Sequence, residues 1–302
     1  MRTLAAFSCS FAIAALLGCS SSDAPAAATP PQITHESGRS AGCGKTVEEL
    51  PTAWSNHDLT VQVDPEFVAT HGARRYFTRP PKTYDTNQAY PVTIWGNGCG
   101  TTSVQGTPMS AGPAAQGSIQ VQLLAINGCF SAGPDGDHAN SPELPYFDAV
   151  LAEVEQNYCV DTSKVYLAGF SSGGWFTSLM ACARTQKLRG VAWLAAGLQF
   201  NHPECVGPMA AIIARGVEDA AKTPLDQTQT ALEDLRVRNG CSSETEPWDP
   251  GETTFSSEPC VAYKGCKPEA PLVWCPIPGG HTDGTSTGLS SYGFWKFWTD
   301  IP

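Results

Sequence analysis

The chain has 302 residues, with 18 Lys and Arg against 29 Asp and Glu, a formal net charge of -11 and 12 cysteines. Its length fits one domain of up to about 250 residues with additional segments, and its 41% of hydrophobic residues excludes a chain that is disordered throughout. The acidic balance, without a cluster of Lys or Arg, argues against a nucleic-acid partner, because phosphate binding needs positive charge. The many cysteines, without zinc-type C-x-x-C pairs, indicate an oxidising compartment.

The N-terminal segment has the pattern of an export signal. Arg2 precedes an apolar run from Leu4 to Leu17 that is too short to span a bilayer comfortably. The run ends in Leu16-Leu17-Gly18-Cys19, which resembles the bacterial lipobox. We therefore predict a lipoprotein signal peptide over residues 1–18 and a lipid anchor on Cys19, with an ordinary signal peptide as the alternative.

Residues 19–42 are rich in Ser, Ala, Pro and Thr and predict a flexible tether. These segments predict an extracytoplasmic protein, either a bacterial lipoprotein of the outer membrane or cell surface or a secreted protein. Contact with a membrane is expected only through Cys19. Residues 43–302 contain no internal repeat or second long linker, so we expect one domain there. Its ten cysteines permit up to five disulfides, although their spacing does not give the pairing.

Within the domain, strand-like and helix-like patterns alternate. Short runs of β-branched and apolar residues predict strands at Leu59–Val63, Arg74–Thr78, Val92–Trp95, Gln120–Ile126, Val165–Ala168, Val191–Leu194, Ala210–Ala214 and Leu272–Cys275. Helical periodicity predicts helices at Glu143–Asn157, Gly173–Thr185, Thr228–Arg238 and Ser290–Trp298. The alternation indicates the α/β class, with a mostly parallel sheet flanked by helices. The first two strands lack an intervening helix and predict an antiparallel edge.

The segment from Lys164 to Gly174 reads KVYLAGFSSGG, a strand-like run that leads through a Gly-Phe-Ser-Ser-Gly turn into an apolar helix. This is the context of a serine nucleophile on a strand-turn-helix elbow, where glycines flank the serine because a Cβ would crowd the turn. The pattern G-x-S-x-G occurs again at Gly284–Gly288. No apolar strand precedes that copy and no helix starts at Ser286, so we interpret it as a polar loop. Ser171 is the predicted nucleophile.

In such a fold the acid and then the histidine follow the serine, each on a loop after a strand. Only His202 and His281 follow Ser171, and His202 lies in a turn-like Asn-His-Pro segment ahead of any suitable acid. His281, after a strand and a Pro-Gly-Gly turn, is the predicted base. Asp219 follows the strand Ala210–Ala214 and is the predicted acid, with Glu218 as the nearest competitor.

A serine hydrolase also needs two backbone N–H groups that stabilise an oxyanion. One is expected from Ser172, the residue after the nucleophile. The glycine-rich loop after the strand Val92–Trp95 supplies the second, for which we predict the amide of Cys99. The amides of Gly98 and Gly100 are near alternatives, and an ordinary glycine turn is the alternative without function.

These motifs resemble those of the secreted feruloyl esterases and polyhydroxybutyrate depolymerase-like esterases of the α/β-hydrolase superfamily. The resemblance spans nearly the whole domain and rests on the segments Ala41–Lys45, Asn97–Gly100, Asn157–Asp161, Gly169–Gly174, Asn239–Cys241 and Val273–His281. It implies an α/β-hydrolase fold with Ser171 as nucleophile, Asp219 as acid and His281 as base.

The chain departs from its relatives at two places. It has Asn97-Gly98 where relatives usually have His-Gly, which bears on how the oxyanion loop is held. It has Thr-Asp-Gly after His281 where relatives often carry a proline, which bears on the wall of the substrate site.

We therefore predict a serine carboxylic-ester hydrolase that acts through an acyl-enzyme and needs no metal or organic cofactor. The resemblance implies feruloyl or acetyl esters of plant cell-wall polysaccharide as substrates, with a polyhydroxybutyrate depolymerase second and a peptidase third. A rival of another class is a non-catalytic, carbohydrate-binding surface lipoprotein. Trp95, Trp175 and Trp274 are candidates to stack on a phenolic acid, with a place in the core as the alternative. Loops braced by disulfides around the site complete the expectation.

Overall fold

The computed structural model describes residues 38–46, 53–59, 73–130, 141–198, 205, 207–254 and 260–302. The predicted signal peptide, Cys19 and most of the predicted tether lie outside these residues. So do His35, His71, His138 and His202, together with residues 60–63 of the first predicted strand.

The centre of the fold is a parallel sheet. The strands follow the order β1-β2-β4-β3-β5-β6-β7-β10-β9-β8, and neighbours from β4 to β10 pair in parallel. The parallel strands are β3 (Tyr90–Gly96), β4 (Ile119–Leu123), β5 (Val160–Phe170), β6 (Gly190–Leu194), β7 (Ala211–Gly216) and β10 (Leu272–Ile277). Each contains or overlaps a predicted strand. In an arrangement of this kind the loops that follow the strands gather at one edge of the sheet.

Both ends of the sheet are antiparallel. At one end, β1 (Ser55–Leu59) pairs with β2 (Arg74–Arg79), which pairs with β4, so the predicted antiparallel edge is confirmed. The first strand was expected at Leu59–Val63, and the described part of that range shares only Leu59 with β1. At the other end lie β8 (Thr245–Pro247) and β9 (Val261–Tyr263), which were not predicted. These strands have three residues each and no buried side chain, so they lack a hydrophobic pattern.

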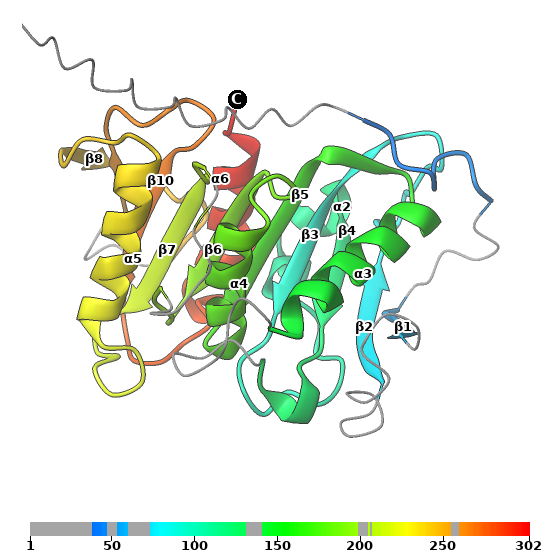
Figure 1. Cartoon of the computed structure of the whole chain (residues 1–302), viewed down its shortest axis with the longest axis horizontal. Helices are drawn as coiled ribbons and strands as arrows, with labels where there is room; N and C mark the ends of the chain where they lie inside the picture. Colours follow the sequence, from blue (N-terminus) through cyan, green and yellow to red (C-terminus); the bar gives the residue numbers. More distant parts are fainter. Residues whose placement is uncertain are drawn as a thin grey trace, which may run out of the picture. The chain divides into compact units, whose positions relative to one another are not determined.

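Helices cover both faces of the sheet (Figure 1). On one face lie α3 (Glu143–Asn157), α4 (Ser172–Ala183) and α5 (Leu225–Arg238), close to their predicted ranges. On the other lie α2 (Ala114–Gly117) and α6 (Phe294–Thr299), with the short turns η1 (Pro108–Ala111) and η4 (Leu289–Gly293) beside them. The turns η2 (Ile126–Gly128) and η3 (Thr285–Thr287) complete the described elements. None of the helices in these residues has the length and hydropathy to cross a bilayer.

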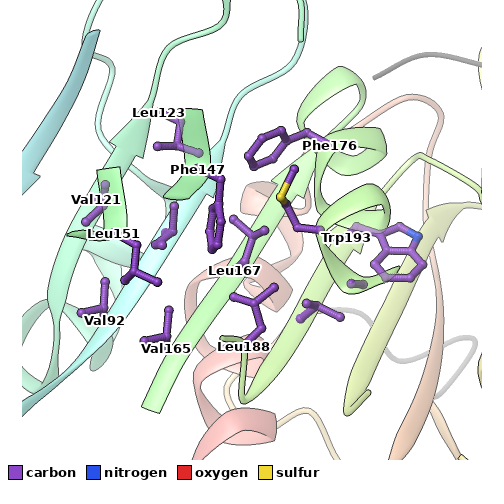
Figure 2. Close-up of a cluster of buried hydrophobic side chains, with 14 of the residues drawn as sticks. Val92, Val121, Leu123, Phe147, Leu151, Val165, Leu167, Phe176, Leu188 and Trp193 are labelled. Carbon is purple, nitrogen blue, oxygen red and sulfur yellow. The ribbon is translucent and has the colours of Figure 1, made fainter. Parts of the chain in front are cut away.

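Alternate residues of the central strands enter two separate hydrophobic layers, because successive side chains of a strand point to opposite faces. In β5, Val165 and Leu167 face α3 and α4, whereas Tyr166 and Ala168 face α6. Figure 2 shows the first layer, in which Phe147 from α3 and Phe176 from α4 lie over the strands. Burial on both faces explains why the strands read as continuous apolar runs in the sequence.

All ten cysteines of the domain form disulfides: Cys43–Cys159, Cys99–Cys129, Cys182–Cys205, Cys241–Cys266 and Cys260–Cys275. Such a set of bonds is maintained outside the reducing cytosol. The protein is therefore extracytoplasmic. The bond between Cys99 and Cys129 joins the loop after β3 to the segment after β4.

A buried ion pair anchors β2 to α3. Arg74 Nη2 lies 2.6 Å from Glu143 Oε2, and the two side chains are 0% and 1% exposed. The guanidinium also stacks over the ring of Tyr146, with 3.6 Å between its central carbon and the ring centroid. Removing one partner from such a pair leaves the other charge buried without its counter-charge, which is strongly destabilising.

We expect Arg74→Met to lower the free energy of unfolding by about 3–5 kcal/mol, because Glu143 then loses its buried counter-charge. Urea denaturation measures the change. Lys264→Met is the control, since Lys264 and Glu244 form an exposed pair with a 4.0 Å separation and such pairs contribute less than about 1 kcal/mol. Equal effects of the two substitutions would contradict the assignment of Arg74–Glu143 as a structural pair.

Candidate active site

Ser171 occupies the turn between β5 and α4. Its backbone has φ 54° and ψ -120°, outside the regions that residues with a side chain normally adopt. Its amide donates to the carbonyl oxygen of Leu194 at 3.0 Å, which ties the turn to the end of the neighbouring strand β6. A strained conformation held in this way at the carboxyl edge of a parallel sheet is the geometry of a nucleophile elbow.

The elbow packs directly against the loop that follows β3. A Cβ at Gly173 would collide with the carbonyl oxygen of Gly96, so no larger residue fits without moving one of the two segments. Ser172 Oγ donates to the carbonyl oxygen of Asn97 at 3.3 Å. The small residues after Ser171 therefore allow the elbow and the candidate oxyanion loop to touch.

His281 and Asp219 complete a chain of hydrogen bonds to Ser171. His281 Nε2 lies 2.9 Å from Ser171 Oγ, and His281 Nδ1 lies 2.7 Å from Asp219 Oδ2. The Asp219 side chain is 2% exposed and that of His281 is 16% exposed. The three residues predicted as nucleophile, base and acid are thus brought together, although Ser171 and His281 are 110 positions apart.

The loops that carry Asp219 and His281 extend the pairing of β7 with β10. The amide of Val217 donates to the carbonyl oxygen of Ile277 at 2.9 Å, and the amide of Glu218 donates to that of Gly279 at 3.0 Å. A Cβ at Gly216 would collide with the carbonyl oxygen of Gly280, so this glycine permits the close approach. The side chain of Glu218 is exposed, and the competitor for the acid position is not brought to His281.

Two further side chains hold these loops, and the sequence analysis did not identify them. Arg215 is buried and donates from Nε to the carbonyl oxygen of Thr223 at 2.8 Å and from Nη2 to that of Asp219 at 2.5 Å. The ring of Phe170 packs on His281 with 4.8 Å between centroids. Arg215 lies at the end of a strand and Phe170 precedes Ser171, and both positions are evident in the sequence. Nothing in the sequence indicated which loops they would contact.

The candidate oxyanion loop lies beside the nucleophile. A Cβ built at Gly98 would be 3.3 Å from Ser171 Cβ, so the loop passes within contact distance of the serine side chain. The amide of Gly100 donates to the carbonyl oxygen of Gly128 at 2.8 Å, which removes it as an oxyanion donor. Cys99 is tied to Cys129 by a disulfide. The amides of Ser172 and Cys99, with Gly98 as the alternative, remain the candidates.

Asn97 stands where relatives usually carry histidine, and it is fixed from the side of the strand. The indole Nε1 of Trp95 donates to Asn97 Oδ1 at 2.7 Å. Because the indole can only donate, this bond defines which end of the amide is oxygen. Asn97 Nδ2 is buried, and no hydrogen-bond partner for it is found among the described residues. The Trp95–Asn97 bond thus orients the start of the candidate oxyanion loop.

The tryptophans predicted to stack on substrate lie mainly in the core. Trp95 is 1% exposed and Trp175 is 9% exposed, so neither presents an open ring face. Trp274 is half-buried and packs against the same core. Strand alternation points the ring of Trp95 into the core, and helical periodicity does the same for Trp175. The stacking role of these two residues is therefore not retained. Ser286, in the second G-x-S-x-G segment, is exposed in η3 as expected for a polar loop.

Comparison with curated proteins identifies feruloyl esterases as relatives. Feruloyl esterase D of Neurospora crassa is 28% identical over 277 residues, which cover 86% of this chain and 90% of the relative. Feruloyl esterase C of Emericella nidulans is 28% identical over 225 residues, covering 72% of this chain and 79% of the relative. No protein-family model matches the chain.

Solved structures share the fold at low sequence identity. An acetyl xylan esterase from Aspergillus awamori superposes with a TM-score of 0.55 and 13% identity over 82% of this chain and 99% of its own. The feruloyl esterase module of Clostridium thermocellum, solved in complex with sinapinate, gives a TM-score of 0.52 and 11% identity. The match covers 84% of this chain and 95% of the module. At these identities the likeness establishes the architecture.

The relatives cover most of the chain, and its fold superposes on that of solved esterases. The chain is thus a carboxylic ester hydrolase with the α/β-hydrolase fold, and the curated proteins it is similar to are feruloyl esterases.

Proposed function

We propose that the protein is a serine esterase that uses Ser171 as nucleophile, His281 as general base and Asp219 as the group that orients the histidine. The observation that carries this proposal is the continuous chain of hydrogen bonds from Asp219 through both nitrogens of His281 to Ser171 Oγ. Asp219 accepts from Nδ1, so Nε2 is left without its proton and can take one from the serine.

In the proposed reaction, Ser171 Oγ attacks the ester carbonyl carbon while its proton passes to His281 Nε2. The carbonyl oxygen becomes an oxyanion that accepts hydrogen bonds from the amides of Ser172 and Cys99. The intermediate collapses as His281 returns the proton to the departing alcohol oxygen, leaving an acyl-enzyme. Water, deprotonated by the same nitrogen, then releases the acid and restores Ser171.

For the substrate we propose feruloyl or acetyl esters carried by plant cell-wall polysaccharide. Support comes from the curated relatives, which are named feruloyl esterases, and from solved neighbours named acetyl xylan esterase and feruloyl esterase. A polyhydroxybutyrate depolymerase is the second candidate because the elbow and the cysteine-containing motifs resemble both groups. Release of ferulate from arabinoxylan, compared with release of hydroxybutyrate from a polymer film, separates the two.

We expect Ser171→Ala to lower kcat on methyl ferulate by about 10⁴-fold or more, because the acyl-enzyme can no longer form. Asp219→Asn should also lower kcat strongly, since the amide favours the wrong tautomer of His281. Stopped assays at substrate saturation measure both effects.

The chain contains a matched control for each of these substitutions. Ser286→Ala changes the serine of the second, exposed G-x-S-x-G segment, and Glu218→Gln changes the exposed neighbour of the acid. Both should retain activity near the wild-type level. Substantial turnover by Ser171→Ala, or a loss of kcat in Ser286→Ala equal to that in Ser171→Ala, would contradict the proposed triad.

The disulfide Cys99–Cys129 is expected to hold the oxyanion loop in position. Replacing both residues with alanine keeps the Cys99 amide but frees its loop, so we expect kcat on methyl ferulate to fall by about 10²-fold, the size of the loss of one oxyanion donor. The control is the pair Cys241 and Cys266, whose separation of 25 residues is close to the 30 of Cys99–Cys129.

Cys241 follows the end of α5 and Cys266 precedes β10, which places this second bond away from the edge that carries Ser171. Loop lengths of this kind predict similar stabilisation by the two bonds. Kinetics and thermal unfolding on both double variants distinguish the roles. An unchanged kcat in the Cys99/Cys129 variant, with a normal Tm loss, would show that the bond serves the scaffold alone.

We also propose that the protein is exported as a lipoprotein, with residues 1–18 removed and Cys19 lipidated. The proposal rests on the apolar run and the Leu-Leu-Gly-Cys sequence, which lie outside the described residues. We expect Cys19→Ala to move the protein from the membrane fraction to the soluble one. Mass spectrometry of the mature N-terminus checks the modification, and an unmodified N-terminus at another residue would contradict it.

A further inference from the structure

A cavity of about 440 Å³ opens beside the proposed catalytic residues. Its size lies within the range of small-molecule sites. Its walls come from the start of the oxyanion loop, from residues 105–111 and from the segment after His281, and its polar lining residues are Asn97, Gln105, Thr107, Ser110, Asp283 and Thr285. Trp95 contributes little surface to the cavity, since it is 1% exposed.

The position of this cavity relative to His281 determines which part of an ester it can receive. His281 Nε2 must return a proton to the departing alcohol oxygen, so that oxygen lies within hydrogen-bond distance of Nε2 in the proposed reaction. Asp283 and Thr285 follow His281 directly in the chain and form one wall of the cavity. Asn97, whose carbonyl oxygen accepts from Ser172 Oγ, also lines the cavity. The cavity is thus adjacent to the place of the leaving alcohol.

The chemistry of the walls suits an alcohol with several hydroxyl groups. Two amides, three hydroxyls and one carboxylate line the cavity, against three apolar side chains from Trp95, Pro108 and Ala111. A phenolic ring or an alkyl chain would offer no hydrogen bond to the lining groups that are not already bonded within the chain, which carries a cost for each such group that is desolvated. A sugar offers both donors and acceptors at the spacing of its hydroxyls.

Hydrogen bonds to side chains of β4 and η4 hold the wall formed by residues 105–111 in place. Gln122 Oε1 accepts from the amides of Gln105 and Gly106 at 3.1 and 2.9 Å. Ser110 Oγ donates to Gln120 Oε1 at 3.0 Å, and Ser291 Oγ donates to the carbonyl oxygen of Pro108 at 3.0 Å. The cavity is therefore preformed, and a ligand meets little cost in ordering the wall.

Asp283 gives the cavity a negative charge. One of its carboxylate oxygens, Oδ1, accepts from the amide of Thr285 at 3.0 Å, and among the described residues no donor bonds to Oδ2. The described residues that line the cavity include no Lys or Arg, so none of them offsets the charge. A neutral hydroxyl can donate to this carboxylate, whereas an anionic alcohol is repelled.

Building on the proposed esterase function, we propose that this cavity is the leaving-group subsite and that it selects neutral, polyhydroxylated alcohols, such as a sugar, over small or anionic ones. Asp283 is the residue that discriminates against anionic alcohols. It lies in the Thr-Asp-Gly segment that follows His281.

The test compares three ferulate esters with the same acyl group: 5-O-feruloyl-arabinose, methyl ferulate and feruloylquinate, whose alcohol is polyhydroxylated and anionic. Ala111→Phe fills the cavity from an exposed position and keeps the backbone carbonyl that accepts from Tyr292. We expect it to lower the ratio of kcat/KM for the arabinose ester to that for methyl ferulate about 10-fold. Gln116→Phe, exposed on α2 and outside the cavity, should leave this ratio unchanged.

Asp283→Asn supplies the second measurement, because it removes the charge and keeps an oxygen that can accept from the Thr285 amide. We expect it to raise the ratio of kcat/KM for feruloylquinate to that for the arabinose ester about three- to ten-fold. The subsite assignment is wrong, although the esterase function stands, if Ala111→Phe lowers kcat/KM equally for the arabinose ester and methyl ferulate. It is also wrong if Asp283→Asn leaves the ratio of kcat/KM for feruloylquinate to that for the arabinose ester unchanged. If the wild type hydrolyses none of the three esters, the proposed function itself fails.

Discussion

The parallel pairing of β10 with β7 is the constraint on which the site depends. The ladder continues past the ends of both strands, through the amides of Val217 and Glu218 and the carbonyl oxygens of Ile277 and Gly279. It brings Asp219 to His281 although 62 residues separate them. A shift of one residue in this register would turn alternate side chains to the opposite face, so the same hydrogen bonds that hold the core together also align Asp219 with His281.

The proposed nucleophile depends on a second set of constraints at the end of β5. Ser171 holds an unfavourable backbone conformation, which persists because Leu194 on β6 and the loop after β3 contact the turn on two sides. Strain of this kind costs roughly 1–3 kcal/mol and survives only when the surrounding packing determines it. Two buried layers, one on each face of the sheet, provide that packing.

The loops at the same edge are stiffened by polar and covalent links. Arg215 bonds the carbonyl groups on either side of the acid turn, Trp95 orients Asn97, and a disulfide joins Cys99 to Cys129. Buried glutamines of β4 hold the wall of the cavity beside His281. An ester carbonyl placed at Ser171 would therefore meet groups that are already in position, which is the condition for electrostatic stabilisation of a transition state without reorganisation.

Much of this architecture was accessible from local patterns. The buried strands read as apolar runs because both faces of the sheet are covered, and α3 was predicted with its observed bounds because its apolar residues recur with helical period. The choice of Ser171, Asp219 and His281 as candidates followed from chain order and from strand ends, since carboxyl ends of parallel strands share one edge, and the structure brings the three side chains together. The three-residue strands β8 and β9 were missed because pairing to β10, with no hydrophobic pattern, defines them.

Contacts between distant segments required the folded chain. Spacing could not pair the cysteines, because each of the five bonds depends on which loops become neighbours. Closeness in the sequence to the proposed site made Trp95 and Trp175 candidates to stack on a ligand, with the core as the alternative, and their burial places both rings in the core. The amide of Gly100 was ruled out as a donor by its bond to Gly128, and Asp283 became a candidate for selectivity only once a cavity beside it was seen. Sequence patterns report the period and chemistry of each segment, and only tertiary packing decides which segments meet.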